Sequence, residues 1–170
     1  MNIVRNMIIS AVLLALFAIA GTFFVSQTYD NTIDKINENK RLALLKALHV
    51  LVPQNTHDND IFTDFIQVED KNLLGSKNPV AVYRARKEKK PVAVIINSVA
   101  PDGYNGKIEL LVAINYNGTL AGVRVSSHKE TPGLGDAIDE NRSDWITKFE
   151  QLSLTNPDKK GWAVKRDGGQ

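Results

Sequence analysis

The chain has 170 residues with 21 basic and 19 acidic side chains, a formal net charge of +2, and no cysteine. This near balance of charge, spread along the chain, excludes the strongly basic surface typical of nucleic-acid-binding proteins. The lack of cysteine excludes disulfides, thiolate nucleophiles and cysteine-ligated iron–sulfur or zinc centres. The three histidines do not have the spacing of a metal-binding motif. Redox chemistry in this chain therefore requires an organic cofactor or a partner protein.

Residues 7–25 contain no charged side chain and are almost wholly apolar. A helix of this length spans ~28 Å, close to the ~30 Å hydrocarbon thickness of a bilayer. A cleaved signal peptide is the alternative, because Arg5 precedes the stretch and the Ala-Ile-Ala at 18–20 imitates a cleavage site. The apolar run continues past that tripeptide, which favours a retained transmembrane helix. With Arg5 before the span and Asp30 after it, the positive-inside rule predicts a cytoplasmic N-terminus, residues 1–6, and a periplasmic main domain.

A second helical pattern follows within residues 26–53, where apolar residues recur at mostly helical spacing from Thr32 to Leu51 and Pro53 ends the run. We expect a membrane-proximal helix there, and a polar, loop-like segment from Pro53 to Gly75. The loop holds three aspartates, Asp58, Asp60 and Asp64, that raise the possibility of calcium binding. They lack the glycine and the terminal glutamate of an EF-hand loop, which favours solvated side chains or helix caps.

Four runs rich in β-branched residues come next, and two short links between them suit hairpins. The runs are residues 79–86, 91–99, 107–116 and 119–126. A longer turn-rich link, 101–106, joins the middle pair. The pattern predicts an α+β fold: a single domain, residues 54–170, with a mainly antiparallel sheet flanked by helices.

After the strands, residues 139–152 carry Trp145, Phe149 and Leu152 on one helical face. We interpret this stripe as helix packing, with a flavin-stacking surface as the alternative. A short final strand is expected at 161–164 and a turn at 167–169.

The sequence Ser-His-Lys-Glu-Thr-Pro-Gly-Leu-Gly-Asp at 127–136, here named the signature loop, lies between the last strand-like run and that helix-like run. Pro132 favours an extended residue before it, while Gly133 and Gly135 can take positive φ and let a ligand approach bare backbone. Free N–H groups in such a turn suit an anion such as a phosphate. A plain Pro-Gly turn is the alternative reading of the same pattern.

The signature loop closely resembles the corresponding loop in the FMN-binding domain of the G subunit of Rnf-type electron transport complexes. The related C subunit of the sodium-translocating NADH:quinone oxidoreductase has a similar Glu-Thr-Pro-Gly-Leu-Gly. The N-terminal membrane helix, the strand-rich middle and the closing Gly-Trp-Ala-Val-Lys-Arg-Asp-Gly-Gly at 161–169 also sit where that family has them, so the resemblance covers essentially the whole chain.

The resemblance implies a membrane-anchored, flavin-carrying electron-transfer subunit, not a stand-alone enzyme. Its complex would couple electron transfer between NADH and ferredoxin to ion translocation, with the other subunits and the lipid bilayer as partners. The implied cofactor-binding residues are His128, Glu130, Thr131, Gly133, Leu134 and Gly135. His128 and Glu130 would orient the flavin or its phosphate.

One feature of the family pattern is missing. The family attaches FMN through the last hydroxyl residue of a Ser/Thr-Gly-Ala-Ser/Thr motif that follows the Gly-Gly segment, and this sequence, which stops at Gln170, contains no Ser/Thr-Gly-Ala. Three interpretations stay open: C-terminal truncation, flavin binding without a covalent bond, or loss of the cofactor. Two further functions are considered, the C subunit of the sodium pump and a flavin-free membrane-anchored assembly module.

Overall fold

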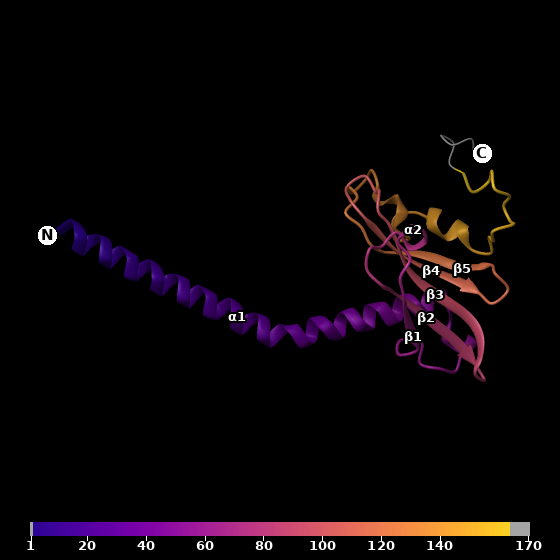
Figure 1. Ribbon diagram of the computed structural model, residues 1–170, viewed down its shortest axis with the longest axis horizontal. Helices are drawn as coiled ribbons and strands as arrows, with labels where there is room; N and C mark the ends of the chain where they lie inside the picture. Colours follow the sequence, from indigo (N-terminus) through magenta and orange to yellow (C-terminus); the bar gives the residue numbers. More distant parts are fainter. Residues whose placement is uncertain (1, 164–170) are drawn as a thin grey trace. The chain divides into compact units, whose positions relative to one another are not determined.

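The computed structural model describes residues 2–163, which form one long helix and a five-stranded sheet with short helical segments (Figure 1). The elements are α1 (Asn2–Leu51), η1 (Gln54–Thr56), β1 (Phe65–Val68), α2 (Lys71–Leu74), β2 (Val80–Lys87), β3 (Lys90–Ala100), β4 (Ile108–Asn115), β5 (Leu120–Ser127), η2 (Asp136–Ile138) and η3 (Trp145–Phe149). The chain divides into two compact units, Met1–Leu44 and Leu45–Gln170.

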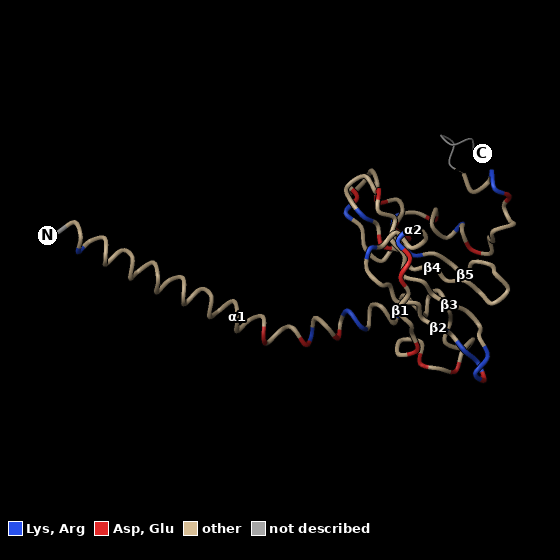
Figure 2. The backbone as a smooth tube through the Cα atoms, in the orientation of Figure 1, with Lys and Arg blue, Asp and Glu red and all other residues tan. Residues whose placement is uncertain are grey.

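The first unit is the N-terminal part of α1, which carries no charge between Arg5 and Asp30 (Figure 2). Ile3–Leu51 is long and apolar enough to cross a membrane, a property that it shares with signal sequences at the same position. Two of its hydroxyl groups are bonded inside the helix: Thr22 and Thr28 donate to backbone carbonyls four residues earlier, each at 2.8 Å. The helix therefore presents no unpaired threonine hydroxyl at these two positions.

The second unit is built on an antiparallel sheet in the order β1-β2-β3-β4-β5. The β2–β3 turn places Glu88 and Lys89 at positive φ, as two-residue hairpin turns require, and Gly118 takes φ 84° in the β4–β5 turn. The four predicted strands and the predicted antiparallel sheet are thus confirmed. Tight turns keep consecutive strands in register, so that one edge of the sheet collects the ends of β3 and β5.

The core lies between the strands and the residues that flank them. Its buried members from outside the sheet include Leu48, Leu51, Val52, Ile61 and Ile146, and those from the sheet are Val80, Tyr83, Ala85, Ala93, Ile95, Leu111, Ala113 and Val123. A Cβ added at Gly122 of β5 would stand 2.9 Å from the Leu51 side chain. The last turn of α1 therefore packs directly on the sheet, and glycine at position 122 allows the close approach.

The expectation of a loop throughout 53–75 was wrong in three places, the first of which is the 3-10 turn η1. Residues Phe65–Val68 form the edge strand β1, and Lys71–Leu74 form the single turn α2, capped by the Asp70 carboxylate. The strand is short and mostly exposed, with Phe65 and Ile66 each 43% accessible, so it lacks the alternation that marks a half-buried strand. Pairing with β2, and not sequence pattern, defines it.

The helix expected at 139–152 is also wrong. Only Trp145–Phe149 is helical, as the 3-10 turn η3. Upstream, the Ser143 hydroxyl donates to the Ala137 carbonyl and accepts from the Trp145 N–H, which competes with helical bonding. Downstream, the backbone of residues 151–152 pairs with Leu120 of β5. The expected strand at 161–164 is a turn at 161–163; Val164 and the expected turn at 167–169 lie outside the described residues.

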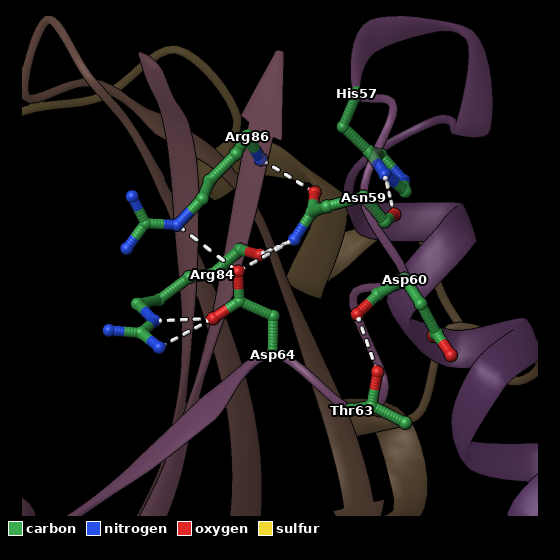
Figure 3. A network of polar contacts seen from close by, with 7 residues as sticks. All are labelled: His57, Asn59, Asp60, Thr63, Asp64, Arg84 and Arg86. Carbon is green, nitrogen blue, oxygen red and sulfur yellow. Dashed lines mark hydrogen bonds and ion pairs between the residues drawn. The ribbon is translucent and has the colours of Figure 1, made fainter. Parts of the chain in front are cut away.

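A polar network ties the segment before β1 to β2 (Figure 3). The Asp64 carboxylate binds the Arg84 guanidinium at 2.6 Å and the Arg86 Nε at 3.1 Å, and it accepts a hydrogen bond from Asn59 at 3.0 Å. The Asn59 amide also bridges the β2 backbone, accepting from the Arg86 N–H and donating to the Arg84 carbonyl, each at 2.8 Å. Asp64 is therefore the centre of an ion-pair network with Arg84 and Arg86.

The other two aspartates considered for calcium also bind the protein. Asp58 accepts from the Glu88 N–H at 2.7 Å, and Asp60 accepts from the Phe62 N–H at 3.0 Å. Within residues 2–163 no group of three or more His, Asp or Glu side chains is placed to hold a metal ion.

Asp64→Ala should lower the free energy of unfolding of the second unit by about 2 kcal/mol, because it leaves two partly buried arginines without their shared partner. Urea unfolding of the detergent-solubilised chain, followed by circular dichroism, measures this change. Asp144→Ala is the matched control: it removes an exposed pair with Lys148 and should change the free energy by less than about 0.5 kcal/mol. Equal effects of the two variants would contradict a structural role for the Asp64 network.

Candidate functional site

Two loops meet at one edge of the sheet. The β3–β4 loop, residues 101–107, leaves β3 at Ala100, and the signature loop leaves β5 at Ser127. Both strand ends pair with the start of β4, Ala100 with Ile108 and Ser127 with Glu109. The register of three neighbouring strands therefore brings together two loops that are far apart in the chain.

Direct hydrogen bonds join the two loops. The Asn105 backbone N–H donates to Glu130 Oε1 at 3.1 Å, and its side-chain amide donates to Thr131 Oγ1 at 2.9 Å. One residue of the β3–β4 loop thus holds two consecutive residues of the signature loop.

The signature loop is folded on itself through Thr131 and Asp136. The Thr131 carbonyl accepts from the N–H groups of Leu134 and Gly135, at 3.1 and 3.0 Å, and the Asp136 carboxylate accepts from the Gly133 N–H at 2.8 Å. Gly133 adopts φ 80°, as the sequence predicts for a tight turn, whereas Gly135 lies at φ -101°, in the right-handed region. These three N–H groups have protein acceptors, so the loop offers side chains to a ligand in place of the amide cradle expected for an anion.

His128 and Glu130 act on the shape of the loop. The His128 Nδ1 accepts from the Glu130 N–H at 3.1 Å, which places the ring proton of the neutral imidazole on Nε2. A Cβ added at Gly135 would stand 2.8 Å from the Glu130 Cβ, and one added at Gly103 would stand 3.0 Å from Oε1. The Glu130 side chain is thus packed between two glycines, one from each loop, where any larger residue would displace it.

A cavity of about 310 Å³ lies where the loops meet. Its lining residues are Tyr104, Glu130, Thr131, Leu134 and Gly135. Four of the six residues expected from sequence therefore line it, while His128 and Gly133 shape the loop behind it. Tyr104 and Leu134 are 94% and 83% accessible, and so are open to a ligand.

Sequence reasoning missed Tyr104 and Asn105. The signal available was one aromatic residue in the turn-rich sequence Pro-Asp-Gly-Tyr-Asn-Gly at 101–106, a position where an exposed ring has no packing role. What the sequence did not reveal is that this loop lies beside the signature loop.

The segment that follows the signature loop contains a carboxylate, Asp139, that is hydrogen-bonded to Asn141. Hydrogen bonds from the backbone N–H and the side-chain amide of Asn141 hold the pKa of the Asp139 carboxyl below its ordinary value, against the opposing effect of burial. A lowered carboxyl pKa means that this contribution is present at neutral pH and is lost only as the pH falls through the folded-state pKa. The hydrogen bonds from Asn141 to the Asp139 carboxylate are therefore present at neutral pH.

A second cavity, of about 430 Å³, lies against β4 and β5. Its lining is entirely apolar and comprises Ala100, Ile108, Leu110, Val112, Leu120, Val123, Val125, Ile138, Trp145, Ile146, Phe149 and Trp162. Trp145 and Phe149 pack edge to face, with ring centroids 5.0 Å apart. None of the six candidate residues reaches this cavity, and its lining side chains offer a ligand no carboxylate, hydroxyl or amide.

Two segments of the chain match known protein families. Residues 1–51 match the RnfG N-terminal region, a segment that ends where α1 ends, and residues 103–170 match the FMN-binding domain. A Shewanella baltica protein, named as the G subunit of an ion-translocating oxidoreductase complex, is 44% identical over 163 residues, which is 96% of this chain and 77% of that protein. Proteins of the same name from Aliivibrio fischeri and Vibrio cholerae are 41% and 40% identical over 161 residues, 95% of this chain and 77% of each.

The chain belongs to the RnfG family. The FMN-binding domain match covers both the signature loop and residues 103–107 of the β3–β4 loop, and so includes every residue that lines the smaller cavity. The family expected from the signature loop is thereby confirmed, as is the presence of an FMN-binding domain.

Proposed function

We propose that this chain carries FMN in the cavity between the signature loop and the β3–β4 loop, and that it serves as a membrane-anchored electron-transfer subunit of an Rnf-type complex. The observation that carries the proposal is the meeting of these two loops inside the matched FMN-binding domain. The C subunit of the sodium pump is not favoured, because the relatives described above are all named as G subunits of ion-translocating oxidoreductase complexes.

The residues present fit a flavin. A flavin ring is planar and aromatic with a polar edge, and the cavity combines two exposed apolar side chains, Tyr104 and Leu134, with the hydroxyl of Thr131. Space is open beside Gly133, where an added Cβ would meet no atom within 4 Å. The apolar cavity beside η3 fits less well, because the only polar groups of its lining side chains are two indole N–H groups, and that of Trp162 already donates to the Ser153 carbonyl.

Each residue has a distinct task in this proposal. Tyr104 and Leu134 provide apolar contact with the ring, and Thr131 provides a hydrogen bond. His128, Glu130, Gly133 and Gly135 hold the loop in the shape that leaves the cavity open. Bound FMN would supply the capacity to accept and release electrons, which the side chains of this chain do not have. The protein contributes position, local polarity and access.

The contacts proposed for Tyr104, Thr131 and Leu134 are noncovalent. The complexes named for the relatives imply further subunits as partners, and electron transfer between NADH and ferredoxin is the reaction we propose for the assembly. A flavin-free assembly module is the alternative, and flavin binding decides between the two.

We further propose that α1 anchors the chain in the bacterial inner membrane with residues 1–6 in the cytoplasm and the sheet domain in the periplasm. The long uncharged stretch supports the anchor, and Arg5 before it with acidic residues after it supports the orientation.

Gly133→Ala should weaken FMN binding by at least about tenfold, because alanine at φ 80° is strained by ~1–2 kcal/mol and the loop will relax into another shape. Titration of FMN fluorescence with the detergent-solubilised chain measures the affinity, and dithionite followed by air shows whether the bound flavin is reduced and reoxidised. Gly118→Ala is the matched control, with φ 84° and equally open space in a distant turn, and it should bind FMN normally. Equal affinity in the two variants removes the signature loop from the site; no binding by the unaltered chain supports the flavin-free module.

The proposed orientation is tested by single cysteines, which this chain naturally lacks. Asn6→Cys and Tyr116→Cys place thiols before the span and in the exposed β4–β5 turn. A membrane-impermeant maleimide added to spheroplasts should label only the cysteine at position 116, whereas both should react after detergent lysis. Labelling of position 6 alone would contradict the proposed orientation and indicate a periplasmic N-terminus.

A further inference from the structure

The Thr131 hydroxyl has one hydrogen-bond partner among the described residues, and that partner is a donor. The Asn105 side-chain amide donates a hydrogen bond to Thr131 Oγ1, with 2.9 Å between the nitrogen and the oxygen. Nothing else within residues 2–163 accepts the proton of this hydroxyl, although Thr131 lines the cavity. A hydroxyl has one proton to donate and two lone pairs to accept with. Its proton is therefore left for an acceptor in the cavity.

We propose that Asn105 is a positioning residue of the flavin site, which fixes the Thr131 hydroxyl as a hydrogen-bond donor toward the bound flavin. The inference rests on the proposed function, since FMN supplies the acceptors: the carbonyl oxygens and nitrogens of the flavin ring, which riboflavin shares. Asn105 itself does not line the cavity. It acts from behind the loop, through Thr131.

The two bonds made by Asn105 are separable. The backbone N–H that holds Glu130 persists in any non-proline substitution, whereas the bond to Thr131 belongs to the side chain alone. Asn105→Ala removes the side-chain bond. Asn105→Asp keeps a similar shape but offers only acceptors, so the Thr131 hydroxyl would donate to position 105 and be lost to the flavin.

The experiment measures FMN dissociation constants by fluorescence titration of the full chain in detergent. Asn105→Ala and Asn105→Asp should each weaken binding roughly three- to tenfold, the range expected for loss of one hydrogen bond. Riboflavin is titrated in parallel, because it lacks the phosphate that a carboxylate at position 105 would repel. Asn78→Ala changes an exposed asparagine before β2 and serves as the control with unaltered affinity. Circular dichroism verifies that every variant folds.

A double-mutant cycle decides whether Asn105 acts through Thr131. In the Thr131→Ala background, Asn105→Ala should raise the FMN dissociation constant by less than about twofold. In the Thr131→Ser background, which keeps a hydroxyl, it should raise the constant as much as in the unaltered chain. An undiminished effect beside Thr131→Ala overturns the inference, as does normal affinity of Asn105→Ala, or normal riboflavin affinity of Asn105→Asp. Failure of the unaltered chain to bind either flavin defeats the proposed function as well, and so is distinguishable.

Discussion

The hydrogen bonds from Asn105 to Glu130 and Thr131 are the constraint on which the proposed site depends. Each loop alone is an exposed turn with few buried contacts, and such segments open at little cost in free energy. Once joined, the loops limit each other: Glu130 is packed against a glycine of each, and Thr131 holds the turn through its carbonyl while its hydroxyl is oriented by the neighbouring loop. A cavity with one preferred shape results from two segments that would otherwise vary independently.

That constraint depends on the strand pairing of the sheet, which positions both loops although the β2–β3 and β4–β5 pairings contain register shifts. Tight β2–β3 and β4–β5 turns fix the register of neighbouring strands, and the ladder across β3, β4 and β5 brings the ends of two strands to one edge. The core beneath them comes from the last turn of α1, where Leu48 and Leu51 are buried, and from the strands themselves. The end of the helix that is proposed to anchor the protein thus also completes the hydrophobic core of the sheet domain.

Sequence patterns predicted the parts of this protein that are governed by local chemistry. Runs of β-branched residues and the short link between them predicted the β4–β5 hairpin, and Gly133 adopts the expected positive φ, although Gly135 does not. Features defined by contacts between distant segments were missed. The strand β1 exists because it pairs with β2, and the expected helix at 139–152 fails because residues 151–152 bond to Leu120 instead. Asn105 was missed for the same reason, since its partners lie 25 and 26 residues further along the chain.

The location of the flavin is the central claim, and amide hydrogen exchange with and without FMN tests it most directly. Binding between the loops should slow exchange in residues 101–107 and 128–135, because a bound ligand suppresses the opening motions of both segments. Exchange in Trp145–Phe149, beside the larger apolar cavity, should be unchanged. Slower exchange confined to that 3-10 turn, or no change anywhere in the domain, would contradict a flavin site formed by the two loops.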